Sequence, residues 1–198
     1  MTDDMDRPWQ VSLDLPTTWF GLTCDEETDR AQVPTAVQAR LREEPDLGAG
    51  DAMVDVLLGW SASAASLGAA AAAMRWARDE TFGMAMATLM LRRLERDPGS
   101  LETELQRLRP MLAKQTPADE FAPRVTEVAL ASGQALRMEA VRQPSDGSQP
   151  LRLVIEYWLP MEDIDLVQMS FGTSNLALAD ELSTEFEFVA STLAVEPT

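Results

Sequence analysis

Apolar and polar residues alternate along residues 151–159, and this alternation predicts a β-strand with one strongly apolar face. The apolar members of the pattern are Leu151, Leu153, Ile155, Tyr157 and Leu159. Pro160 ends this strand, and after a polar connection residues 166–171 alternate again. Val167, Met169 and Phe171 face one way in that second segment, so the two segments predict a pair of antiparallel strands.

An amphipathic helix is predicted directly after these strands, with Thr173, Ser174 or Asn175 as its cap. Its apolar residues recur at helical spacing: Leu178, Leu182, Phe186, Val189 and Leu193. Its acidic residues lie on the opposite side: Asp180, Glu181, Glu185 and Glu187. The apolar stripe is expected to lie across the sheet, which makes this region a C-terminal strand-turn-strand-helix unit.

Shorter patterns earlier in the chain predict further strands and helices. Strands are expected at residues 9–15, 19–22, 125–130 and 134–141, and helices at 35–44, at 51–60 and from Leu101 onward. The last helix places Leu101, Leu105, Leu108 and Leu112 on one face, and Pro110 should kink or stop it. In the last two helices Asp51 and Ser100 are the expected caps, and the 51–60 helix is apolar enough to be buried. Together the patterns predict an α+β fold, an antiparallel β-sheet with helices packed on its faces, in one domain spanning residues 1–198.

Residues 64–94 are compatible with a helix by their alanine content, but we interpret them as a β-hairpin. Gly68 interrupts the alanine run, residues 78–83 have the composition of a turn, and residues 88–93 alternate in polarity. Small alanine side chains on a strand would let a helix pack close to the sheet.

Composition narrows the class of protein. The chain is 45% hydrophobic and 25% charged, as in ordinary globular proteins, and no apolar run approaches the ~20 residues of a membrane-spanning helix. The acidic N-terminal segment lacks the apolar stretch of a secretory signal, so a cytoplasmic location is expected. A net charge of −17 disfavours nucleic acid and anionic membrane surfaces and favours neutral or basic partners. Lys114 is the only lysine, and an arginine-rich, alanine-rich composition is typical of GC-rich, actinobacterial genomes.

The absence of histidine from the whole chain is the strongest functional constraint. It removes histidine-based nucleophilic catalysis, histidine zinc sites and the usual general base near neutral pH. The single cysteine, Cys24, excludes an intramolecular disulfide and any multi-cysteine metal site. Ser61 resembles half of a nucleophile elbow but lacks the second glycine, so we interpret it as a helix residue. No cofactor or metal is therefore expected.

Three charged clusters are weak candidates for chemistry. The DEETD segment, residues 25–29, is either a calcium-like loop or a solvated turn before a helix; the turn is favoured because the EF-hand glycine and glutamate are missing. Asp163 and Asp165, beside Glu162, could bind a cation or do acid/base work, but a charged turn between two strands is the favoured interpretation. An arginine cluster is interpreted as a solvated junction rather than an anion site: Arg92, Arg93, Arg96, Arg107 and Arg109.

The strand at residues 151–159 carries apolar groups on both faces, and this suggests a binding surface. Beyond the core-facing residues, Val154 and Trp158 lie on the second face with Arg152 and Glu156 around them. Burial of that face beneath the helices at 35–44 and 51–60 is the favoured interpretation. If the cover is partial, Trp158 borders an apolar groove suited to a basic amphipathic helix of a partner.

The segments EYWLP, LVQMSFGTSNLAL and EFEFVASTLAV, with the preceding VALASGQALRMEAV hairpin, resemble small actinobacterial proteins with the PsbP-like α+β sandwich. Proteins of this kind include an extrinsic photosystem II subunit, a Ran-binding import factor, small lipoproteins and chaperones of type VI secretion effectors. The resemblance implies a binding module and supplies no catalytic residue.

These observations predict a cytoplasmic, non-catalytic protein-binding module, an adaptor or a chaperone-like protein with a neutral or basic protein partner. The alternative is a small-molecule or metal-binding regulatory domain. A hydrolase that uses carboxylates alone is the least favoured of the three.

Overall fold

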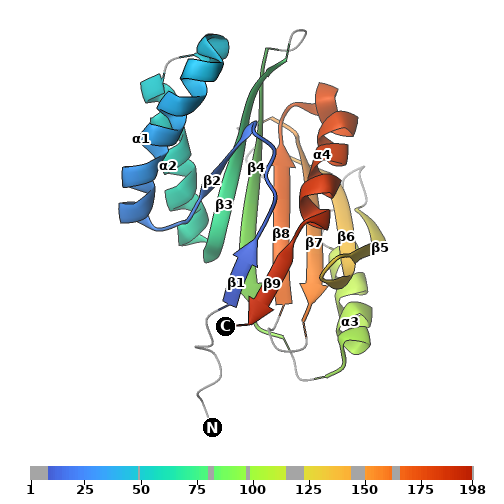
Figure 1. The fold of residues 1–198 in the computed structure, drawn as a ribbon. Coiled ribbons are helices and arrows are strands. Elements are labelled where there is room, and N and C mark those ends of the chain that lie inside the picture. The colour runs from blue at the N-terminus through green and yellow to red at the C-terminus, as the bar shows by residue number, and fades with distance from the viewer. Residues whose placement is uncertain are drawn as a thin grey trace.

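The structure is a computed structural model that describes residues 9–48, 50–79, 83–96, 99–114, 123–143, 150–161 and 166–197. Its centre is an antiparallel sheet in which the strands follow the order β2-β3-β4-β8-β7-β6-β5 (Figure 1). The strands are β2 (Trp19–Leu22), β3 (Ala69–Asp79), β4 (Gly83–Leu94), β5 (Arg124–Leu130), β6 (Gly133–Arg142), β7 (Arg152–Pro160) and β8 (Leu166–Thr173). The predicted α+β fold, an antiparallel sheet with helices on its faces, is confirmed.

Helices cover both faces of this sheet. α4 (Ala179–Ser191) packs on one face, over a core that contains Ile155, Phe171 and Phe186. On the other face, α1 (Glu26–Glu43) and α2 (Gly50–Ser66) lie at the β2–β3 end, and α3 (Leu101–Ala113) lies at the β5–β6 end (Figure 1). The second face therefore has two separate apolar cores, one beneath α1 and α2 and one beneath α3.

The C-terminal unit has the predicted order and phase. β7 and β8 pair antiparallel, with Ile155 opposite Phe171, and the predicted apolar stripe of α4 lies in the core. The predicted cap is wrong, because a 3₁₀ turn at Leu176–Leu178 precedes α4 and Leu178 occupies the cap position without a side-chain hydrogen bond. Glu185 is also less exposed than predicted: its carboxylate accepts from Arg75 Nε at 3.0 Å.

The hairpin predicted within residues 64–94 is confirmed. β3 and β4 pair along their length, and Gly68, with φ of 76°, precedes β3 in a conformation that glycine adopts readily. Residues 80–82 of the predicted turn lie outside the described residues. Successive alanines of β3 lie on opposite faces of the sheet. Ala72 packs in the core beneath α1 and α2, and Ala73 packs in the core beneath α4.

A separate pair of strands joins the two ends of the described chain. β1 (Trp9–Ser12) pairs antiparallel with β9 (Ala194–Pro197), so Trp9 lies opposite Pro197. The strand predicted at residues 9–15 therefore ends at Ser12, and β9 was not predicted. Beyond β1 the chain crosses the α4 side of the sheet, where Leu13 and Leu15 pack against the main core.

Three helix boundaries differ from the predictions. α1 begins at Glu26 rather than Thr35 and contains Pro34, while Asp25 caps it by accepting from Thr28 N at 2.8 Å. α2 runs beyond Trp60 to Ser66 and buries one face only, since Val56 is 41% exposed. The cap at Ser100 is confirmed, but α3 continues through Pro110.

Candidate functional site

The four residues proposed from the sequence as a binding surface do not form an open groove. Trp158 is only 7% exposed and lies in the core beneath α3 with Leu108 and Leu136. Its indole Nε1 donates to Glu156 Oε2 at 3.0 Å, and Glu156 is itself buried. The cover over this part of the second face is α3, not the two helices at residues 35–44 and 51–60 that were expected to provide it.

Val154 and Arg152 lie farther along the same face of β7 and are partly exposed. The Arg152 guanidinium donates to Thr88 Oγ1 at 3.2 Å, across β8. The four residues thus share one sheet face as predicted, but the exposed Trp158 ring that a docking partner would need is absent.

The acidic cluster and the arginine cluster proposed from the sequence do not form a shared site among the described residues. Asp163, Asp165 and Glu162 lie outside the described residues. The arginines hold different neighbours: Arg92 Nε donates to Gln168 at 2.9 Å, Arg96 reaches Gly99 O, and Arg109 pairs with Glu127 at 3.1 Å. No shared anion site is built from them within the described part of the chain.

Asp29, predicted as part of a solvated turn, is instead buried at 2% exposure in the first turns of α1. Its carboxylate accepts from the backbone N–H groups of Thr23 and Cys24 and from Ser61 Oγ, at 2.9, 3.1 and 2.5 Å. These bonds fasten the end of β2 and the middle of α2 to α1. Asp29 is therefore a structural carboxylate with its bonding capacity used, and Ser61 is the helix residue that the sequence predicted.

Cys24 lies beside this carboxylate and is partly buried. Burial, with the neighbouring Asp29 charge, raises the pKa of its thiol to about 11. A thiol with that pKa carries almost no thiolate near neutral pH, so Cys24 lacks the property that a catalytic cysteine requires.

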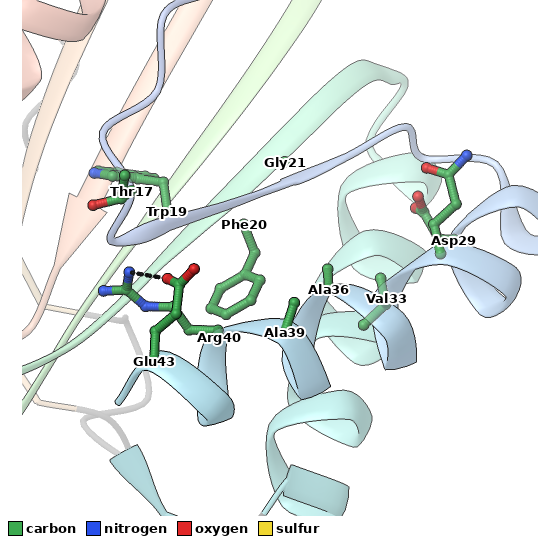
Figure 2. Close-up of a pocket in the computed structure, with 11 residues that line it drawn as sticks. Thr17, Trp19, Phe20, Gly21, Asp29, Val33, Ala36, Ala39, Arg40 and Glu43 are labelled. Carbon is green, nitrogen blue, oxygen red and sulfur yellow. Dashed lines mark ion pairs between the residues drawn. The ribbon is translucent and has the colours of Figure 1, made fainter. Parts of the chain in front are cut away.

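A groove of about 410 Å³ separates β2 from α1, and we take it as the candidate site among the described residues. Figure 2 shows β2 running alongside α1, with Ala36 and Ala39 pointing toward the strand and Phe20 pointing from the strand toward the helix. The small side chains of α1 and Gly21 of β2 leave the space open. Trp19 lines one end, and its indole Nε1 is held by Glu185 Oε1 at 2.5 Å.

Arg40 is the one charged side chain in the groove wall that is both buried and incompletely bonded, among the described residues. It is 9% exposed, and its terminal nitrogens pair with Glu44 at 2.7 Å and Glu43 at 3.9 Å. Its Nε is buried without a hydrogen-bond acceptor. A buried donor left without a partner costs about 1–3 kcal/mol, so the groove contains a binding group that an acceptor from a ligand would satisfy.

The sequence contained signals for this site that were not used. Arg40 follows Val33 and Val37 at helical spacing on the buried stripe of α1. Gly21 stands inside a strand, where glycine often marks a close approach of another backbone or a ligand.

The carboxylates and the guanidinium of the groove wall are engaged with one another, with Ser61 or with backbone groups. Within the described residues no group of three or more metal-ligating side chains gathers. In the described part of the chain no helix is both long and apolar enough to cross a membrane.

The fold and the groove define an α+β protein with a groove at one edge of its sheet. No family model matches the chain, and no curated protein matches it. Among solved structures, the chain is similar to the crystal structure of LpqN, described as involved in cell envelope biogenesis of Mycobacterium tuberculosis. The TM-score is 0.55 at 12% sequence identity, over 97% of this chain and 86% of that one. At this identity the likeness shows a related fold and nothing about ligand or activity.

Proposed function

We propose that the protein is a non-catalytic protein-binding module, an adaptor or a chaperone-like protein, and that its partner binds in the groove between β2 and α1. The observation that carries this proposal is Arg40 Nε, a buried donor in the groove wall with no acceptor. An acceptor from a bound partner would remove the cost of leaving that donor unpaired. The proposal replaces Trp158 by the groove as the contact site.

The charges around the groove favour a neutral or basic partner. Glu43 and Glu44 border Arg40 with 74% and 48% of their side chains exposed, and the chain as a whole carries a net charge of −17. Such a surface attracts basic segments and repels acidic ones. The finer resemblance to PsbP-like proteins and the cytoplasmic location stay predictions from the sequence.

Affinity purification from the native host tests the proposal with two matched substitutions on α1. Ala39→Trp places a large ring in the groove, whereas Gln38→Trp adds the same ring on the exposed side away from it. We expect the unmodified protein and the Gln38→Trp variant to recover the same stoichiometric partner, and Ala39→Trp to lose it. Equal recovery by both variants, or repeated recovery of the protein alone, contradicts the proposal.

The volume of the groove also favours a second candidate, a small-molecule-binding regulatory domain, because pockets for small ligands measure about 300–1,000 Å³. A thermal-shift screen with metabolites and metal ions distinguishes the two. A ligand at a hundred times its Kd stabilises the folded state by about 2.7 kcal/mol. A stabilising metabolite whose effect disappears in Ala39→Trp would favour this candidate over a protein partner.

A further inference from the structure

The outer edge of β2 opens into the groove. β2 pairs with β3 alone, so it is an edge strand of the sheet in the described structure. An edge strand presents main-chain N–H and C=O groups to any extended segment that lies beside it. Gly21 belongs to this edge, is exposed, and lines the groove.

The pairing register shows which groups point outward. Trp76 N donates to Thr18 O at 2.9 Å, so residue 18 directs its main-chain groups toward β3. In an antiparallel pair this direction alternates, so Phe20 also bonds toward β3, whereas the groups of Trp19 and Gly21 point away from it.

Bonds at both ends of β2 confirm the alternation and define the open length. Trp19 N donates outward to Pro16 O at 2.9 Å, and Thr23 N donates outward to Asp29 Oδ1 at 2.9 Å. Between these two bonds lie the carbonyl of Trp19 and both main-chain groups of Gly21, for which the described residues supply no partner. This is room for an added strand of about three or four residues, at roughly 3.3 Å each.

Arg40 lies on the opposite wall of the same groove, and Figure 2 shows its guanidinium in the space between α1 and the start of β2. Because Glu43 and Glu44 already balance its charge, the acceptor that its Nε lacks is a neutral one. A main-chain carbonyl is such an acceptor. The two exposed glutamates disfavour an acidic segment and favour basic side chains on the outer side of the added strand.

We propose that the occupant of the groove is an extended, neutral or basic peptide segment that adds as a strand to the outer edge of β2, bonds to Gly21 and places a main-chain carbonyl on Arg40 Nε. This inference rests on the proposed protein-binding function and specifies its mode. Affinity then comes from main-chain bonds and charge, with little demand for a particular side chain.

A short blocked peptide in which lysine and valine alternate is the probe, titrated against the full chain. Gly21→Pro removes the outward N–H, while Gly21→Ala keeps it, since an added Cβ would meet Leu15 Cδ1 at an ordinary 3.5 Å. We expect Gly21→Pro to weaken binding at least about tenfold and Gly21→Ala to leave it nearly unchanged. Arg40→Lys, which keeps the charge and lacks Nε, should also weaken binding.

Three further measurements leave the protein unaltered and so hold even if Gly21→Pro fails to fold. A peptide N-methylated at alternate amides should not bind, and the unmodified peptide should slow hydrogen exchange at the Gly21 amide. A glutamate-for-lysine peptide should bind more weakly than the basic one.

The inference is overturned by absence of saturable binding, by tighter binding of the acidic peptide, by indifference to N-methylation, or by a dimer that Gly21→Pro separates, which would assign the edge to a second copy. If the native partner is lost in Ala39→Trp but retained in a folded Gly21→Pro, the proposed function stands and the added strand does not.

Discussion

Replacing Phe186 by alanine tests the central packing of the fold. Phe186 is fully buried on α4, stacks on Phe171 with ring centroids 4.7 Å apart, and meets the Trp19 ring edge-on at 6.1 Å. Phe→Ala in a core costs about 3–5 kcal/mol, and aromatic pairs add about 0.5–1.5 kcal/mol beyond their buried area. Because two ring contacts are lost together, we expect a cost near the upper end of that range.

The assay is a urea titration followed by far-UV circular dichroism. A loss of about 5 kcal/mol with an m-value of about 2 kcal/mol/M moves the unfolding midpoint down by about 2.5 M. Phe188→Ala is the matched control, because Phe188 lies on the same helix and is 55% exposed. Its midpoint should change by less than about 0.3 M, as expected for a surface substitution.

Glu187→Ala, a second substitution on the exposed side of α4, should also be nearly silent. Glu187 is 61% exposed and approaches Arg137 at 3.6 Å, a pair worth about 0–1 kcal/mol. Equal midpoints for Phe186→Ala and Phe188→Ala would show that α4 is rotated from the phase described above and would refute the reasoning.

Three further predictions concern other buried groups. Trp158→Ala should cost about 3–5 kcal/mol, measured by thermal melting, because the ring fills the core beneath α3; a melting temperature within a few degrees of the unmodified protein contradicts this. Asp29→Ala should cost about 3 kcal/mol and Ser61→Ala about 1 kcal/mol in denaturant titrations, since the carboxylate serves several donors and the hydroxyl only one; the reverse order would be inconsistent with the bonds described. Cys24 should react with iodoacetamide at pH 8 about a hundredfold more slowly than free cysteine, because its pKa is raised from 9.0 to about 11. A reaction rate equal to that of free cysteine would contradict the burial. Because the pKa of the Cys24 thiol is raised only in the folded protein, the contribution of this thiol to the free energy of unfolding is full below pH 9 and is lost as the pH rises toward 11.

Local patterns were sufficient for the C-terminal unit and for the hairpin. Ile155 and Phe171 fall on the same face because side-chain direction alternates along each strand, and no distant contact alters that rule. Gly68 interrupts the alanine run at a turn just before β3, so strand could be chosen over helix for the alanines that follow it.

Local patterns failed where distant contacts override propensity. The helix predicted at residues 35–44 begins earlier, at Glu26, and passes through Pro34. Burial of Val33 and Val37 against α2 and β3 outweighs the one missing hydrogen bond. β9 could not be recognised from four residues, because it exists through pairing with β1 at the other end of the chain.

The candidate site was missed for a similar reason. Trp158 was identified from the sequence because the strand at residues 151–159 carries apolar side chains on both faces. The sequence could not show that α3, rather than α1 or α2, covers the Trp158 ring. The groove depends on β2 being the edge strand, and strand order is set by the whole sheet. Arg40 could have been identified from its spacing to Val37, but its unpaired Nε could not.

The pairing of β1 with β9 has a mechanical consequence. Trp9 lies opposite Pro197, so the two flanks of the chain leave this small sheet at the same end. A force that pulls these flanks apart loads the hydrogen-bonded pairs one after another, as in a zipper, instead of shearing all of them at once. We expect low resistance to stretching at this point, and residues 13–15 to lift from the α4 side of the sheet soon afterwards, while β3, β4 and β8 remain paired.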